Sequence, residues 1–297
     1  MLSYIAFQIG ALLARYTPLA VSYAIARAIG VLTFYAWPGG RRRCIQNMLH
    51  VTGGDMRRAQ RLARTSFANY LVYLVDFFRL TMAEPHEIGG RVRFDRWHEI
   101  ETERRGNGVI FVTVHFGNWD LGAAALAQQG FPVLAIADTL PDARVDRRVR
   151  ASREHIGLHL IPVGRAGPGM LRALRENSVL AILIDIPTPG GIEVEFFGAP
   201  VAVSDGPARI ALRAGASVMA AVLPRLSPWS DTVGAEVVTI HYEPTGDTER
   251  DVLGLTQALF RQFEAFIRLH PEQWYIFRNL WPGDIEAPAQ AVASARG

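Results

Sequence analysis

A histidine and an aspartate lie in the short segment HFGNWD, residues 115–120. His115 directly follows GVIFVTV (108–114), an apolar run that predicts a buried strand, and Asp120 begins the stretch DLGAAALAQQG, which predicts a helix ending at a glycine. Reactive groups in open α/β sheets gather just beyond the carboxyl ends of strands, which is where this prediction places His115. Gly117 permits a tight turn that folds the Asp120 carboxylate back onto the imidazole.

A carboxylate bonded to one ring nitrogen fixes the tautomer of a histidine and leaves the other nitrogen free as a base. The segment therefore predicts a His115–Asp120 dyad that deprotonates a hydroxyl group. The H-x4-D pattern alone is also compatible with a structural histidine or a metal ligand. No G-x-S-x-G motif is present, so a serine hydrolase of the α/β type lacks its nucleophile elbow.

The segment GRAGPG (164–169) follows one predicted strand and precedes a helix. Its glycine spacing differs from that of a dinucleotide-binding loop, and the chain contains no lysine for a Walker motif. Backbone N–H groups at this helix start, together with Arg165, suit a phosphate group. An ordinary turn explains the sequence equally well.

From residue 108 onward, short apolar runs alternate with helical stretches. Strands are predicted at 108–114, 132–137, 158–163, 178–185, 192–198 and 217–225, with an antiparallel edge strand at 234–243. Helices are predicted at 120–130, 142–157, 168–177, 205–216 and 249–270, after an amphipathic, aromatic helix at 55–82. This alternation is typical of the α/β class, with a mostly parallel central sheet covered by helices on both faces.

Two apolar segments, 2–14 and 18–38, occupy the N-terminus without the pattern of a signal peptide. The first is too short to span a bilayer, and the second carries Arg27 near its middle, which is costly in lipid. Because arginines follow from Arg41, helices lying in the interface of an anionic membrane are favoured; a single span and helices that only cap the core are the alternatives. We expect membrane-associating helices over 1–40, an α/β domain over 41–284 and a frayed tail over 285–297.

All 31 basic residues are arginines, which bind phosphate groups in a bidentate manner. The net charge of +3 is too small to indicate nucleic-acid binding. The single cysteine, Cys44, excludes an intramolecular disulfide and argues against a cysteine-based zinc site.

Five sequence blocks occur in a recognisable order: HFGNWD, IPVGRAGPGMLRALREN, VLAILID, GIEVEFFGAPVAVSDGPARIALRAGASV and HPEQWYIFRNLWP. With the apolar N-terminus, they resemble the bacterial lipid A late acyltransferases and the mycobacterial phosphatidylinositol mannoside acyltransferases, within the lysophospholipid acyltransferase superfamily. The resemblance extends to about residue 284. It implies transfer of a fatty acyl group from acyl-CoA or acyl carrier protein to a hydroxyl of a lysophospholipid or glycolipid. It also implies action without metal or cofactor at the cytoplasmic face of the cell membrane, as a peripheral protein or with one N-terminal anchor.

The resemblance assigns roles to individual residues. His115 is implied as the general base, Asp120 as its orienting partner, and Glu193 in GIEVEFFG as a second carboxylate that supports the histidine. Glu193 matches the mannoside-acyltransferase branch and favours a glycolipid or phospholipid acceptor. Contacts to substrate are expected from four further residues: Gly117, Asn118, Arg165 and Asp185. Among these contacts, backbone N–H groups near Gly117 or the Arg165 guanidinium are expected to stabilise the developing oxyanion.

One departure from the family concerns Asp185. Many lipid A enzymes carry an Asp-x-Asp pair after the central strand, whereas this chain reads Asp185-Ile186-Pro187 and keeps only the first acid.

Two other functions are compatible with the same residues. A thioesterase or lipid hydrolase uses the dyad with water in place of the lipid hydroxyl, and a lipid-binding protein uses an apolar groove without chemistry. Four phenylalanines suit either an acyl-chain tunnel or the core: Phe77, Phe78, Phe196 and Phe197. Three late aromatic residues suit either a membrane-interface belt or a seal against the sheet: Trp274, Tyr275 and Trp281.

Overall fold

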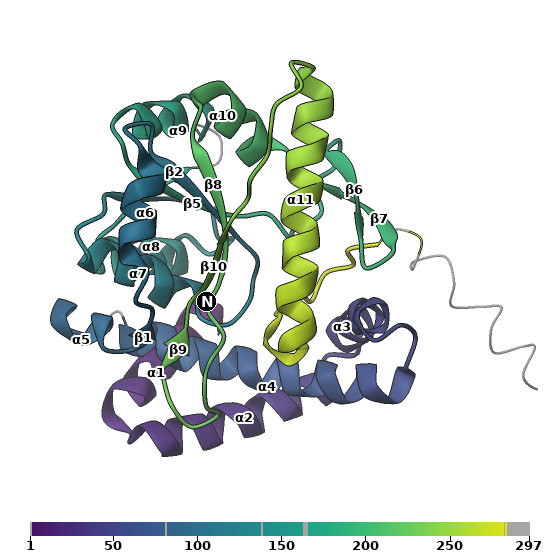
Figure 1. The fold of residues 1–297 in the computed structure, drawn as a ribbon. Coiled ribbons are helices and arrows are strands. Elements are labelled where there is room, and N and C mark those ends of the chain that lie inside the picture. The colour runs from purple at the N-terminus through teal and green to yellow at the C-terminus, as the bar shows by residue number, and fades with distance from the viewer. Residues whose placement is uncertain (1, 81, 138, 163–165, 282, 284–297) are drawn as a thin grey trace, which may run out of the picture.

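The computed structural model describes residues 2–80, 82–137, 139–162, 166–281 and 283. At its centre lies a six-stranded sheet in the order β10-β8-β2-β5-β3-β4 (Figure 1). Only β10 runs antiparallel to its neighbour, which confirms the predicted edge strand. The strands are β2 (Val109–Thr113), β3 (Val133–Ala137), β4 (Leu158–Pro162), β5 (Val179–Leu183), β8 (Ser217–Val222) and β10 (Glu236–Thr239).

Helices cover both faces of this sheet. In β2, Ile110 and Val112 belong to one core while Val109 and Phe111 belong to the other, as the alternation of a strand requires. The first core is closed by α9 (Ala166–Arg175), α10 (Gly206–Ala214) and α11 (Thr248–Leu269), and the second by α6 (Trp97–Arg104) and α7 (Trp119–Gln128); α8 (Ala143–His155) packs against β4. The predicted α/β fold, with a mostly parallel sheet covered on both faces, is confirmed.

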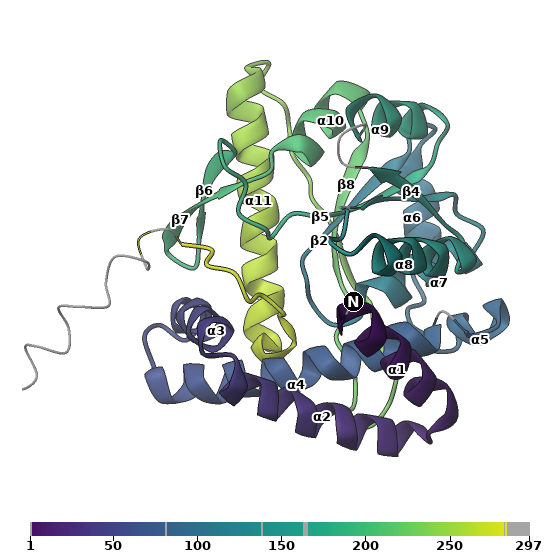
Figure 2. The same cartoon turned by 180° about the vertical axis from the view of Figure 1, so that it is seen from behind.

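Four N-terminal helices lie together at one end of the sheet domain (Figure 2). They are α1 (Leu2–Tyr16), α2 (Leu19–Ala36), α3 (Pro38–Val51) and α4 (Met56–Leu80). α2 packs on α4 through buried residues spaced about one turn apart, among them Ala26, Gly30 and Phe34. A Cβ atom at Gly30 would lie 2.6 Å from the Ala68 Cα, so glycine is what allows the two backbones to approach closely.

Short elements complete the chain. α5 (Pro85–Gly89) precedes β1 (Val92–Arg93), which pairs in parallel with β9 (Val233–Gly234). The predicted strand at 192–198 is β6 (Ile192–Phe196), which forms an antiparallel hairpin with β7 (Ala199–Val203) and packs on α11. A 3-10 turn, η2 (Pro271–Gln273), follows α11. The expected tail over 285–297 lies outside the described residues.

α2 is the one helix in the described part of the chain that is long and apolar enough, by length and composition, to cross a membrane. Its outward face carries Val21, Ile25, Ile29 and Leu32, all exposed. Arg27 lies at the side of the helix, where its guanidinium donates to the Asn69 side-chain oxygen (3.1 Å) and to the Pro228 carbonyl (2.7 Å). The positive charge of Arg27 is therefore held by hydrogen bonds within the protein, and the exposed face of α2 is apolar and uncharged.

Candidate active site

His115 lies just beyond the carboxyl end of β2, as the sequence predicts, but the carboxylate beside it is Asp185. His115 Nδ1 lies 2.7 Å from Asp185 Oδ1, and the main-chain N–H of His115 donates to Asp185 Oδ2 (2.9 Å). The indole Nε1 of Trp274 donates to the same Oδ2 (3.0 Å). Asp185 is fully buried, so these donors satisfy a carboxylate that has no access to solvent.

The charge on Asp185 is stabilised by these neighbours. Burial by itself raises the pKa of the carboxyl, but His115 and the hydrogen bonds from Trp274 and the main chain lower the pKa below its ordinary value. An ionised Asp185 accepts a hydrogen bond from Nδ1–H, and this tautomer has its lone pair on His115 Nε2. The His115 side chain is 26% exposed, and no hydrogen bond to its Nε2 occurs among the described residues. The geometry is that of a partly exposed histidine oriented through Nδ1, an arrangement suited to a general base.

Asp120 does not pair with His115, contrary to the expected turn. Its carboxylate accepts from Arg153 Nε (2.7 Å) on α8 and from the Tyr73 hydroxyl (2.6 Å) on α4. The negative charge of Asp120 raises the pKa of the Arg153 guanidinium above its ordinary value. Asp120 lies in the first turn of α7, so these contacts join α7 to α8 and α4.

The strand register explains why Asp185 takes the place expected for Asp120. β2 and β5 are adjacent parallel strands in which Thr113 pairs with Leu183. Residues two positions further along each strand, His115 and Asp185, therefore leave the sheet side by side. The sequence places both residues at strand ends but does not state that the two strands are neighbours.

Gly117 and Asn118 hold the turn between β2 and α7. Gly117 has φ +62°, and a Cβ atom there would lie 1.9 Å from the Leu223 carbonyl oxygen, so only glycine fits. Its N–H donates to the Gln273 carbonyl (2.9 Å), and the N–H of Asn118 donates to the Leu223 carbonyl (3.0 Å). The Asn118 side chain is buried and caps α7 by accepting from the Leu121 N–H (3.1 Å). Both N–H groups expected at the oxyanion thus already have acceptors inside the protein.

Arg165 and Glu193 are the two remaining predicted residues. Arg165 lies outside the described residues. Glu193 is exposed on β6, while Val194 and Phe196 of the same strand enter the core. No hydrogen bond or ion pair between Glu193 and His115 occurs among the residues that the structure describes.

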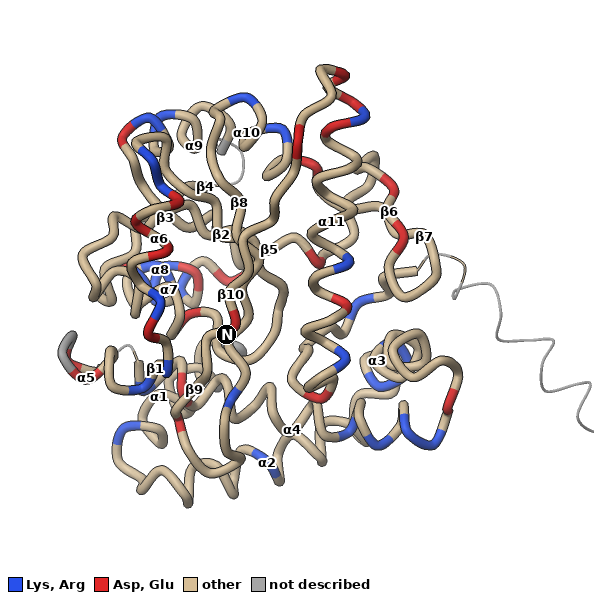
Figure 3. The backbone as a smooth tube through the Cα atoms, in the orientation of Figure 1, with Lys and Arg blue, Asp and Glu red and all other residues tan. Residues whose placement is uncertain are grey.

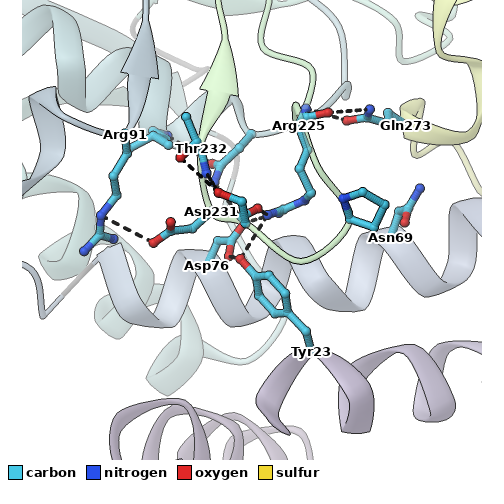
Figure 4. Close-up of polar contacts among 12 residues, drawn as sticks. Tyr23, Asn69, Asp76, Arg91, Arg225, Asp231, Thr232 and Gln273 are labelled. Carbon is cyan, nitrogen blue, oxygen red and sulfur yellow. Dashed lines mark hydrogen bonds and ion pairs between the residues drawn. The ribbon is translucent and has the colours of Figure 1, made fainter. Parts of the chain in front are cut away.

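A buried polar network behind the turn was missed by reasoning from the sequence. Asp76 on α4 accepts hydrogen bonds from the Tyr23 hydroxyl and the Arg225 guanidinium (Figure 4), and Asn118 Nδ2 lies 3.4 Å from its second oxygen. The main-chain N–H of Arg225 donates to the Gln273 side chain (2.7 Å). Burial raises the pKa of the Asp76 carboxyl, and Arg225 opposes that effect. The one available signal was an aspartate within the aromatic run FANYLVYLVDFFRL.

An apolar cavity of about 60 Å³ lies between the sheet and the helices α6 and α7. Side chains from α6, α7 and the strands β2, β5, β8 and β10 line it, and Thr113 is the only polar one among them. Trp119 forms part of the wall, and its ring lies 5.2 Å from the His115 ring in a T-shaped arrangement. By contrast, Phe196 and Phe197, which the sequence offers for a tunnel or for the core, belong to the core cluster around Trp274.

Comparison with known proteins identifies the family. The sequence model described as "Bacterial lipid A biosynthesis acyltransferase" matches residues 1–282. The chain belongs to this family. It is 27% identical to a phosphatidylinositol mannoside acyltransferase of Mycolicibacterium smegmatis over 262 residues, which are 85% of this chain and 83% of the relative. It is also 27% identical to a protein of that name from Mycobacterium tuberculosis over 272 residues, 89% of this chain and 84% of the relative. The predicted acyltransferase class is thereby confirmed.

In this acyltransferase, the aromatic segment after α11 contacts the His115–Asp185 pair. Trp274, Tyr275 and Trp281 are all buried, so they form the seal and not a membrane-interface belt. The main-chain N–H of Tyr275 donates to the His115 carbonyl (2.7 Å), and Trp274 reaches Asp185. This segment therefore fixes both the main chain of the histidine and the orientation of its carboxylate partner.

Proposed function

We propose that this acyltransferase moves a fatty acyl group from acyl-CoA or acyl carrier protein to a hydroxyl of a membrane glycolipid or lysophospholipid. The observation that carries the proposal is the His115–Asp185 pair, in which a buried carboxylate binds Nδ1 of a partly exposed imidazole. This pair replaces the His115–Asp120 dyad expected from the sequence. A phosphatidylinositol mannoside acceptor is suggested by the names of the two relatives.

The proposed reaction is direct transfer without an acyl-enzyme. His115 Nε2 takes the proton of the acceptor hydroxyl as that oxygen attacks the thioester carbonyl. The tetrahedral intermediate collapses, the C–S bond breaks, and the leaving thiolate recovers the proton from the imidazolium. Asp185 remains ionised throughout and stabilises the imidazolium, the role of the carboxylate in a catalytic triad.

The intermediate needs donors for its oxyanion. The N–H groups of Gly117 and Asn118 are bonded to Gln273 and Leu223, so they are poorly placed for this task. The first-turn N–H groups of Trp119 and Asp120 have no acceptor among the described hydrogen bonds and lie at the positive end of α7. We assign the oxyanion to these groups, with the Arg165 guanidinium as the second candidate.

The apolar cavity beside Trp119 is assigned to the donor acyl chain. Its volume of about 60 Å³ is smaller than the roughly 150 Å³ cavity that admits benzene in another protein. A long acyl chain therefore enters only if side chains of α6 and α7 move away from the sheet. An acyl chain that fills this apolar cavity displaces water beside the thioester, which favours transfer over hydrolysis.

The N-terminal helices are assigned to membrane attachment at the cytoplasmic leaflet. α2 is held along α4 by its buried face, whereas its opposite face exposes Ile25 and Ile29. Leu226 and Trp229, from the loop that binds Arg27, are also exposed. This arrangement supports a helix that lies in the interface over a helix that spans the bilayer.

The test is acyl transfer by the purified full-length protein. Labelled palmitoyl-CoA is offered with a panel of lysophospholipids and phosphatidylinositol mannosides, and His115→Ala is compared with Glu195→Gln, which changes an exposed carboxylate on β6. Labelled lipid from wild type and Glu195→Gln but not from His115→Ala supports the proposal. Free fatty acid as the only product assigns a hydrolase instead. No product with CoA or carrier-protein donors would leave a lipid-binding protein.

A further inference from the structure

A second and larger cavity lies between α3 and the beginning of α4. It is separate from the site around His115, to which α4 contributes only Tyr73 and Asp76, near its C-terminal end. We call it the α3–α4 cavity. It has a volume of about 500 Å³, within the range of small-molecule sites. Its walls are partly apolar, from Ile45, Leu49 and Met56, and its cationic groups come from Arg41 and Arg42.

The charge around this cavity is strongly one-sided. Residues 38–64 contain seven arginines and a single acid, Asp55. Figure 3 shows this cluster as blue segments on α3 and on the adjoining end of α4. No ion pair between one of these arginines and a carboxylate side chain occurs among the described residues. Arginines without carboxylate partners favour an anion, and guanidinium groups match phosphate in particular.

The cavity also adjoins the surface assigned to the membrane. α2 ends at Ala36, and the exposed Trp37 leads directly into Pro38, the first residue of α3 and part of the cavity wall. Met56, at the start of α4, lines the cavity and is itself 47% exposed. The cavity wall therefore begins one residue after the exposed Trp37, at the end of the helix assigned to the membrane.

We infer that the α3–α4 cavity binds one anionic phospholipid, with its phosphate on Arg41 and Arg42 and its acyl chains along Ile45, Leu49 and Met56. Phosphate alone leaves the apolar wall without a partner, and a neutral lipid leaves the two guanidinium groups without an anion. A bound lipid of this kind anchors the α3–α4 end of the protein to an anionic leaflet at a fixed position. The inference goes beyond acyl transfer and does not depend on which acceptor the enzyme uses.

The test is a calorimetric titration of the full-length protein with a short-chain phosphatidylglycerol that is monomeric in water. Arg41→Gln/Arg42→Gln removes the two cavity arginines. Arg57→Gln/Arg58→Gln is the matched control, because it removes the same charge from exposed positions on α4 that do not line the cavity. We expect one lipid per chain in wild type and control, and at least tenfold weaker binding in the cavity variant. Equal weakening by both variants, or full binding by the cavity variant, overturns the inference.

Two further arms separate the cavity from other sources of binding. Glycerol phosphate at the same concentration supplies the phosphate without the chains, and binding equal to that of the lipid reassigns the cavity to a free phosphate. Met56→Asp introduces a negative charge into the cavity wall. Because Met56 is the first residue of α4, an acidic side chain there also stabilises the helix through its dipole. The variant should weaken lipid binding without lowering the melting temperature. Lipid binding is measured without an acyl-transfer assay. Absence of binding would therefore not contradict the proposed acyl transfer, and absence of acyl transfer would not contradict lipid binding.

Discussion

His115 and Asp185 are held side by side by the register of two neighbouring parallel strands, with Nδ1 and Oδ1 2.7 Å apart. The carboxylate is also fixed by the main-chain N–H of His115 and by the Trp274 indole. The hydrogen bonds that orient the base therefore come from the sheet and from the segment after α11.

Asp185→Asn should lower kcat by about 10²–10⁴-fold, the usual contribution of an oriented general base. The amide is close in shape, but it does not stabilise the imidazolium and it favours the wrong tautomer of His115. Steady-state kinetics with saturating donor and acceptor measure the effect. A variant that keeps wild-type kcat would show that Asp185 has no part in catalysis.

Asp120→Ala should act mainly on stability. It leaves Arg153, whose side chain is 24% exposed, without its partner, and breaking a largely buried ion pair costs about 3 kcal/mol. Urea unfolding measures the loss, and kcat per folded molecule should fall far less than in Asp185→Asn. If stability is unchanged while kcat collapses, the dyad expected from the sequence is the correct one.

The stability of the protein should depend on pH through Asp185. Its pKa is lowered in the folded state, so the unfolded chain binds more protons between the folded pKa and the ordinary value near 3.8. This stabilisation is complete above the ordinary pKa and is lost as pH falls through the folded pKa. Unfolding free energies of wild type and Asp185→Asn should therefore converge at acid pH. A constant difference across that range would count against an ionised Asp185.

Gly117→Ala should be far more harmful than Gly53→Ala. Both glycines have φ +62°, so both variants pay the left-handed penalty of about 1–2 kcal/mol. Only at Gly117 does the new Cβ meet another atom, the Leu223 carbonyl oxygen at 1.9 Å, while Gly53 has open space. The difference between the melting temperatures of the two variants measures the effect of the steric clash, because the backbone strain is common to both. Equal losses would mean that the turn adjusts freely around Leu223.

Ile25→Asp/Ile29→Asp should release the protein from vesicles. Burial of an isoleucine contributes about 2 kcal/mol, so two charged replacements should reduce partitioning by at least 100-fold. Both side chains are more than 40% exposed, so folding should be unaffected. Leu253→Asp on α11 is the control, because it alters a similarly exposed side chain (42%) away from α2. Cosedimentation with vesicles containing anionic lipid gives the result.

Local patterns in the sequence determined the elements of this protein. Continuous apolar runs predicted central strands such as β2 to within a few residues, because burial on both faces leaves a signal in the order of residues alone. The antiparallel edge strand β10 was also predicted, although it is only partly buried. The position of His115 at a strand end and the tight turn at Gly117 were predicted for the same local reason.

The partner of the histidine was decided only by tertiary structure. Asp120 is five residues from His115 in sequence, yet it pairs with Arg153, whereas Asp185 reaches the imidazole from 70 residues away. Strand order decides which strand ends meet, and it results from packing of the whole chain, so no local pattern contains it. The Asp76–Arg225 pair is of the same kind, since each buried charge is neutralised by a partner that is distant in sequence.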